Sequence, residues 1–231
     1  MVDKIEKALS YSFKNHSLLE EALTHPSISK QRCDKISFFN YERFEFLGDA
    51  VLGLVIAELL INKYPEEKEG SLAKRLAGLV RGEALACVAR KLNIGEFIKM
   101  TQGEEVMGGR DNSSNIENTL EAIIGAIYID SGLEGARDFI GRHWIELIDN
   151  MKEPPKDPKT ELQEWSQGRG LPIPEYKVIK QTGPSHDPYF EISVKVEGVE
   201  EVTADGHSKK KAEKNAAKKL LKIIKEEDSG K

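Results

Sequence analysis

A short segment near residue 155 constrains the fold of this 231-residue chain more than any other feature. Lys152-Glu-Pro-Pro-Lys-Asp-Pro-Lys159 holds three prolines and five charged residues. Proline removes a backbone donor and clashes with the preceding helical turn, so a continuous helix cannot pass through a segment that also has little to bury. We therefore expect a linker at residues 152–159 between two domains, residues 1–151 and residues 160–226.

The two sides of this linker differ in charge. Residues 1–155 carry 19 Lys and Arg against 25 Asp and Glu, a net charge of −6, whereas residues 156–231 carry 15 against 14, a net charge of +1. Within the second part, Ser208 to Lys225 contains eight lysines and a single acid, Glu213. An acidic body therefore carries a locally basic end.

The sequence shows no sign of export or of a membrane span. The longest apolar run, Ala50 to Ala57, is far shorter than the ~20 residues that a transmembrane helix needs. The chain starts with acids where a signal peptide has a basic and then an apolar region. Cys33 and Cys87 form no metal-binding or disulfide framework. We expect a cytoplasmic protein without a membrane partner.

The first domain has apolar residues at the three- and four-residue spacing of helices. The stretches with this spacing are residues 17–24, 42–63, 71–92, 114–131 and 135–149. Ser71 is the expected N-cap of the third stretch, and Gly132 is the expected stop of the fourth. Because no convincing strand precedes the linker, we expect an all-α domain.

The second domain changes to the period of strands. Residues 190–196 alternate apolar and polar side chains, and weaker strand patterns flank them at 176–181 and 201–204. A short helix is expected at 160–167 and a second one in the lysine-rich end. The apolar face of that last helix consists of Ala212, Ala216, Leu220 and Ile223, with lysines roughly opposite. The order predicts an α+β domain of the type α-β-β-β-α.

The most informative stretch places three acids on one face of a helix. Glu42, Glu45 and Asp49 stand at i, i+3 and i+7, inside an arc of about 60°. The same face continues through Gly53 and Ile56, so we expect these carboxylates on the packed side of the helix, where burial without neutralisation is costly.

A second helix repeats the pattern with Asn118 and Glu121 at i and i+3. Their face continues through Ala122 and Gly125, small residues that would let two helices approach closely. If the two faces meet, carboxylate and amide oxygens gather, and such oxygen-only ligands favour Mg²⁺ or Mn²⁺. A hard cation beside phosphate oxygens supports metal-assisted phosphodiester hydrolysis. The alternative is a solvated acidic face, or acids paired with Arg43 and nearby lysines.

The segment Glu42-Arg-Phe-Glu-Phe-Leu-Gly-Asp-Ala-Val-Leu52 resembles the signature of the ribonuclease III family of double-strand-specific endoribonucleases. Further segments follow in that family's order and spacing: Leu23-Thr-His-Pro-Ser27, Glu69-Gly-Ser-Leu72, Gly103-Glu-Glu-Val-Met-Gly-Gly109 and Glu117-Asn-Thr-Leu-Glu-Ala-Ile-Ile-Gly-Ala-Ile-Tyr-Ile-Asp130. The tail over residues 158–221 resembles the family's double-stranded-RNA-binding domain. The resemblance covers nearly the whole chain.

The resemblance implies a homodimeric endoribonuclease that uses Mg²⁺, with Mn²⁺ as a substitute, and hydrolyses both strands of double-stranded RNA. The implied substrates are structured precursors, including those of ribosomal RNA. Carried over residue by residue, it gives Glu45, Asp49 and Glu121 as catalytic metal-site residues, together with Asn118. It also gives Glu42 and Glu69 as accessory acids near the substrate. We expect His25, in contrast, to be a structural residue near a helix end.

Asn118 departs from the family pattern, which carries an aspartate three residues before the second catalytic glutamate. An amide oxygen can coordinate a cation but brings no negative charge, so metal affinity should fall. The alternative function is therefore a cleavage-impaired protein that binds and sequesters double-stranded RNA.

The resemblance also implies which residues of the tail contact duplex RNA, whose shape is read through 2′-hydroxyls, minor-groove edges and phosphates. The implied contacts are Thr160, Gln163 and Gln167 of the short helix, His186 of the loop at 183–188, and Lys209, Lys210 and Lys214 of the last helix. The alternatives are helix capping, an exposed loop histidine and a solvated lysine face.

Overall fold

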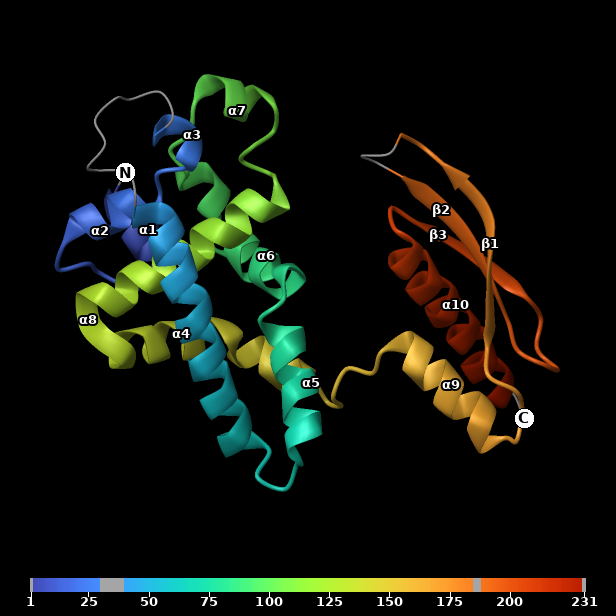
Figure 1. Cartoon of the computed structure of the whole chain (residues 1–231). Coiled ribbons are helices and arrows are strands. Elements are labelled where there is room, and N and C mark those ends of the chain that lie inside the picture. Colours follow the sequence, from blue (N-terminus) through green and yellow to red (C-terminus); the bar gives the residue numbers. More distant parts are fainter. Residues whose placement is uncertain (1, 30–39, 185–187, 230–231) are drawn as a thin grey trace. The chain divides into compact units, whose positions relative to one another are not determined.

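The computed structural model describes residues 2–29, 40–184 and 188–229. The chain divides into two compact units, residues 1–155 and residues 156–231, each with its own hydrophobic core (Figure 1). Within the described ranges, we find no helix with the length and apolar content to span a membrane.

The first unit is helical throughout its described residues, apart from one isolated β-bridge between Thr24 and Lys99. Its helices are α1 (Val2–Leu9), α2 (His16–Ala22), α3 (Pro26–Ser29), α4 (Asn40–Lys63), α5 (Glu69–Leu79), α6 (Gly82–Lys91), the 3₁₀ helix η1 (Ile94–Phe97), α7 (Gln102–Val106) and α8 (Ser113–Asn150). The predicted all-α domain is confirmed, although α1, α3 and α7 were not anticipated.

Helices α4 and α8 pack directly on each other at the centre of this unit, because two glycines remove the side chains that would separate them. A Cβ atom at Gly48 would lie 1.8 Å from the carbonyl oxygen of Glu121, and one at Gly125 would lie 2.2 Å from that of Phe44. The predicted close approach at Gly125 is thus confirmed. Gly53 has open space around it and takes no part.

The helix predicted over 71–92 is in fact two helices, α5 and α6. Helix α5 begins at Glu69 with Lys68 as its N-cap, so the predicted N-cap at Ser71 is wrong. At its other end, the carbonyl oxygen of Leu79 accepts a hydrogen bond from Trp144 Nε1 at 2.9 Å. A tertiary contact therefore satisfies the end of α5, and local periodicity carries no sign of it.

The predicted stop at Gly132 is confirmed as a break in helical geometry. Helix α8 resumes after this residue, but Gly132 itself has φ 74° and ψ −168°, which are not helical. Such a positive φ is accessible to glycine without steric cost. The two predicted helices 114–131 and 135–149 are therefore the two arms of a kinked α8.

The second unit has the predicted α-β-β-β-α order. Its elements are α9 (Pro158–Gly168), β1 (Glu175–Thr182), β2 (Tyr189–Lys195), β3 (Val202–Gly206) and α10 (Lys209–Ser229). The strands form an antiparallel sheet in the order β1-β2-β3. Ala212, Ala216 and Leu220 of α10 are fully buried against this sheet, as the apolar face predicts.

Helix α9 begins inside the segment predicted as the linker. The side chain of Asp157 caps it, accepting hydrogen bonds from the backbone N–H groups of Lys159 at 3.0 Å and Thr160 at 3.5 Å. Pro158 occupies the first helical turn, where its missing N–H group costs nothing. The third proline of the segment therefore starts a helix instead of excluding one.

Candidate active site and RNA-binding surface

A pocket of about 520 Å³ opens beside the contact between α4 and α8. The residues that line it are His25, Pro26, Tyr41, Glu42, Glu45, Phe46, Asp49, Asn115, Asn118 and Glu121. The structure thus brings together five of the predicted site residues from two helices, with their backbones set by the glycine contacts described above. Glu69 does not line this pocket; it lies exposed at the start of α5.

The acids lie at the edge of the helix contact, and only some of them are partly buried. Glu45 and Glu121 are half-buried, whereas Glu42 and Asp49 are exposed. The expectation that all the acids of α4 face the packed side is therefore wrong in part. Ile56, farther along that face, is fully buried, so the acidic end of the face lies where the packing opens into the pocket.

Burial and mutual repulsion raise the pKa values of two of these carboxyl groups. Burial, together with the neighbouring charges of Asp49, Glu45 and Glu117, raises the pKa of Glu121 to about 7. Burial also raises the pKa of Glu45, with added repulsion from Glu42 and Asp49. A bound cation would relieve this repulsion.

Neighbouring hydrogen bonds fix the wall of the pocket. The hydroxyl oxygen of Tyr41 lies 3.0 Å from Thr119 Oγ1, which donates to the carbonyl oxygen of Asn115 at 2.6 Å. The Asn115 amide in turn donates to Glu104 at 3.1 Å and to the carbonyl of Gly109 at 3.0 Å. Burial raises the pKa of Tyr41, so its phenol stays protonated.

Sequence reasoning missed three polar residues of the pocket. Asn115 precedes Asn118 by three positions, so extending the helical spacing backwards would have found it. Tyr41 borders the acidic stretch but has no chemical pattern of its own. His25 reaches the pocket through a long-range contact, in which its backbone N–H group donates to the carbonyl of Lys99 at 2.9 Å, and the sequence carries no signal for that contact.

The donor set suits a hard divalent ion, although no cage is preformed. In the described part of the chain, no three His, Cys, Asp or Glu side chains are grouped closely enough to hold a metal on their own. The pocket nevertheless offers carboxylate oxygens and the amide oxygens of Asn115 and Asn118. Oxygens of this kind are the ligands that Mg²⁺ and Mn²⁺ prefer, and Mg²⁺ commonly keeps several waters.

The predicted RNA contacts of the second unit lie on exposed surface. Thr160, Gln163 and Gln167 are exposed on α9, whose opposite side buries Leu162 and Ser166. The lysines predicted for phosphate contact are exposed on α10: Lys209, Lys210 and Lys214. Lys214 Nζ lies 3.4 Å from the Asp157 carboxylate. The loop residue His186 lies outside the described residues.

Comparison with known proteins identifies both units. A family model described as Ribonuclease-III-like matches residues 15–148, and the double-stranded RNA binding motif matches residues 158–224. Ribonuclease 3 of Wolbachia pipientis subsp. Culex pipiens (strain wPip) is 50% identical over 223 residues, covering 96% of each chain. Ribonuclease 3 of Ehrlichia ruminantium (strain Welgevonden) is 49% identical over 224 residues, covering 97% of each.

A solved structure agrees for the first unit. The nuclease domain of ribonuclease III from Campylobacter jejuni aligns with a TM-score of 0.56 at 42% identity, covering 63% of this chain and 99% of that one. Fold and site together define a nuclease with a helical catalytic domain and a double-stranded-RNA-binding domain. The chain belongs to the ribonuclease III family, and it is an endoribonuclease that acts on double-stranded RNA. Enzymes of this family depend on divalent metal ions in general.

Proposed function

We propose that this endoribonuclease works as a Mg²⁺-dependent homodimer in the cytoplasm and cuts both strands of structured precursor RNAs, those of ribosomal RNA included. The observation that carries the proposal is the gathering of Glu45, Asp49 and Glu121 in one pocket, where burial and neighbouring charges bring the pKa of Glu121 to about 7. Acids arranged in this way are costly unless they bind a cation.

Four residues would hold the ion: Glu45, Asp49 and Glu121 through carboxylate oxygens, and Asn118 through its amide oxygen. When bound, Mg²⁺ supplies positive charge that stabilises phosphate oxygens and lowers the pKa of water. Mn²⁺ accepts the same oxygen ligands and should substitute. Glu121, with a pKa near 7, must first lose the proton on its carboxyl group to serve as an anionic ligand. Glu42 lines the pocket and is proposed as an accessory acid near the substrate, and Glu69 remains a proposed accessory acid outside the pocket.

We assign the exposed face of α9 and the lysines of α10 to duplex RNA. Thr160, Gln163 and Gln167 offer hydroxyl and amide groups that suit 2′-hydroxyls and minor-groove edges. Lys209 and Lys210 offer charge for phosphates, as does Lys214 beside Asp157. His186 is assigned to the second minor groove on the family resemblance alone.

The homodimer is supported by an exposed apolar stripe on α4. Phe46, Leu54 and Ile61 are 79%, 57% and 59% exposed, and helical spacing places them on one side of the helix. Large apolar side chains gathered on one face favour an interaction partner. The Campylobacter jejuni structure concerns flexibility in a region involved in dimer formation of that nuclease domain. The cytoplasmic setting is supported by Cys87, a free thiol.

The dimer is tested by placing charge on this stripe. Leu54→Asp combined with Ile61→Asp should convert the protein to a monomer in sedimentation velocity, because two charges would be desolvated at the interface. Ile145→Asp, at a 47% exposed position of α8 outside the stripe, is the control and should leave the sedimentation coefficient unchanged. Identical sedimentation of the double variant and the parent would refute this interface.

The function itself is tested with an end-labelled RNA duplex incubated with the protein in Mg²⁺, in Mn²⁺ and in EDTA. Metal-dependent fragments from both strands are expected. The alternative, a cleavage-impaired binder, predicts a shifted but uncut band in both metals. That alternative is less favoured because the three proposed carboxylate ligands, Glu45, Asp49 and Glu121, remain in the pocket together with Asn118.

A further inference from the structure

Arg75 is the most deeply buried charged side chain among the described residues, and the acid pocket makes no use of it. It lies on α5 and is only 1% exposed. Burial of a guanidinium is expensive unless its donors are paired and its face is covered.

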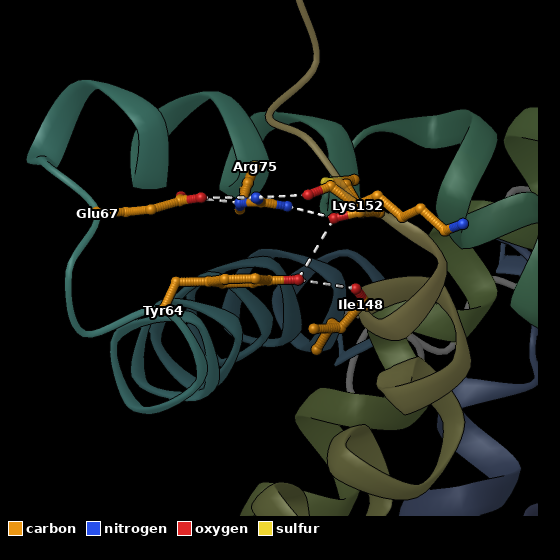
Figure 2. A network of polar contacts seen from close by, with 6 residues as sticks. Tyr64, Glu67, Arg75, Ile148 and Lys152 are labelled. Carbon is orange, nitrogen blue, oxygen red and sulfur yellow. Dashed lines mark hydrogen bonds and ion pairs between the residues drawn. The ribbon is translucent and has the colours of Figure 1, made fainter.

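The guanidinium is fully engaged on one side by Glu67. Arg75 Nε and Nη2 donate to the two carboxylate oxygens of Glu67 at 2.8 and 2.6 Å. Its flat face lies over the Tyr64 ring, with the guanidinium carbon 3.8 Å from the ring centre (Figure 2). Bidentate pairing and stacking of this kind are possible for arginine and not for lysine.

The remaining donors hold the end of α8. Arg75 Nη1 donates to the carbonyl oxygen of Met151, and Nη2 donates to that of Lys152 at 3.2 Å. The Tyr64 hydroxyl lies 3.2 Å from the carbonyl of Ile148 and 3.3 Å from that of Met151. Figure 2 shows both side chains reaching the same turn of chain. We call Tyr64, Glu67 and Arg75 the Arg75 clamp.

The clamp holds more than the last turn of the helix, because the chain beyond it also packs on α5. A Cβ atom at Gly78 would lie 3.1 Å from Pro155 Cγ and 3.2 Å from Met151 Cε. Met151, Lys152 and Pro155 therefore lie against the first unit, so the first half of the predicted linker 152–159 is held there. On the other side, Asp157 is held by the second unit, because it caps α9 and pairs with Lys214.

Lys156 is left between these two fixed points. It is exposed, and no hydrogen bond or ion pair involves it in the described part of the chain. We propose that the Arg75 clamp positions the RNA-binding domain for cleavage by fixing the end of α8, so that Lys156 is the hinge between the two domains. Arg75 is thus a positioning residue, which acts on the reaction through the linker and touches no substrate.

The clamp changes how far the RNA-binding domain can range. One free residue spans at most ~3.6 Å, whereas release of residues 151–156 would allow about 20 Å. A longer tether lowers the effective concentration of one binding module near the other. Loosening the clamp should therefore weaken productive RNA binding and blur the choice of cleavage position, with little effect on the chemical step.

Limited proteolysis tests the hinge without any activity measurement. Trypsin can cleave after Lys152 and after Lys156, and each of these lysines is followed by an acid and then a proline. Of the two lysines, only Lys152 accepts a hydrogen bond from Arg75, at its carbonyl oxygen. In the parent, cleavage after Lys156 should exceed cleavage after Lys152 about tenfold. In Arg75→Met, and more weakly in Tyr64→Phe, the ratio should approach one. Equal cleavage in the parent, or an unchanged ratio in Arg75→Met, would overturn the proposal.

A linker insertion then separates positioning from general damage. An insertion of five residues, all Gly or Ser, after Lys156 of the full chain should raise KM for a hairpin duplex about three- to tenfold. The value of kcat should stay within about twofold of that of the parent. Arg75→Met should do the same, and adding it to the insertion should change KM little further. If the two changes instead raise KM independently, so that their fold-changes multiply in the combined variant, then Arg75 does not act through the linker.

The control is Arg137→Met, which breaks a surface pair with Glu58 at 2.9 Å on the same unit. It should leave the trypsin ratio and KM unchanged. If Arg75→Met fails to fold, Tyr64→Phe retains the stacked ring, removes only the hydroxyl contacts, and decides the question. If the parent shows no metal-dependent cleavage of RNA, the result counts against the proposed function. The ratio of trypsin cleavage after Lys156 to that after Lys152 would still test the hinge.

Discussion

Glu121 occupies a position where solvent is partly excluded and three other acids are near. Its pKa of about 7 lies above the ordinary value of 4.5, so between these values the folded protein binds the proton more tightly than the unfolded chain does. Stability without metal therefore falls as the pH rises through this window. The cost is present in full above pH 7, where the carboxylate is charged, and is absent below pH 4.5.

This sign gives a prediction for Glu121→Gln in EDTA. The variant should melt about 2–4 °C higher than the parent at pH 8 and at nearly the same temperature at pH 5. Thermal unfolding followed by circular dichroism measures both. Glu134→Gln, at an exposed position of the same helix, should show no such pH-dependent gain. A Glu121→Gln difference of equal size at both pH values would count against repulsion as the cause.

Asn118 supplies an oxygen to the pocket without a charge. Asn118→Asp should lower the Mg²⁺ concentration for half-maximal cleavage on the order of tenfold, because an anionic ligand binds a hard cation more strongly. Asn112→Asp is the matched control, since Asn112 caps α8 outside the pocket and aspartate caps equally well. A metal titration that Asn118→Asp leaves unchanged would remove this residue from the proposed ligand set.

At the scale of elements, the α4–α8 contact sets the register of the acids, and Gly125 allows it. Gly125→Ala would force the backbone at Phe44 away, with a cost of about 1–3 kcal/mol from overpacking. Cleavage should fall at least tenfold because Glu45 and Glu121 lie on the helices that separate. Gly141→Ala, on the same helix but in open space, should keep activity and stability. Chemical denaturation and a cleavage assay measure both effects.

At the level of helices, the sequence predicted the acidic faces but not the contacts between distant residues. The acids of α4 and α8 share faces by spacing alone, so the two helices and their acidic faces were predictable from residues 42–49 and 118–121. That the two faces meet was only one of the alternatives that the spacing left open. The role of Gly48 was not predictable, because its partner is the backbone of Glu121, far away in the chain. At the break between α5 and α6, the Leu79 carbonyl likewise accepts its hydrogen bond from distant Trp144, and local patterns carry no record of such contacts.

At the scale of the whole molecule, composition predicted two domains but not where the freedom between them lies. A segment with three prolines and five charges predicts a linker, yet hydrogen bonds to Arg75 and Asp157 hold its two ends. The domain boundaries at 152 and 160 thus stay predictions, while hydrogen bonds from distant side chains reduce the free segment. Buried arginines that bind backbone carbonyls leave no local sequence pattern.

The tail should contribute most of the salt-sensitive part of RNA binding. Lys210→Ala combined with Lys214→Ala should weaken duplex binding and lower the slope of log affinity against log salt by about 1–2, since each lost phosphate contact removes about one released counterion. Lys222→Ala, farther along α10 and 3.8 Å from Glu226, should change neither quantity. Fluorescence anisotropy at several salt concentrations is the measurement. Parent-like slopes would mean that these lysines only solvate the helix.

The most direct test measures Mn²⁺ binding to the RNA-free protein by electron paramagnetic resonance. The parent should hold Mn²⁺ and lose it to excess Mg²⁺, and the double variant Glu45→Gln with Glu121→Gln should bind at least tenfold more weakly because both anionic ligands are lost. Equal Mn²⁺ binding by the parent and by a folded double variant would contradict a metal site between α4 and α8.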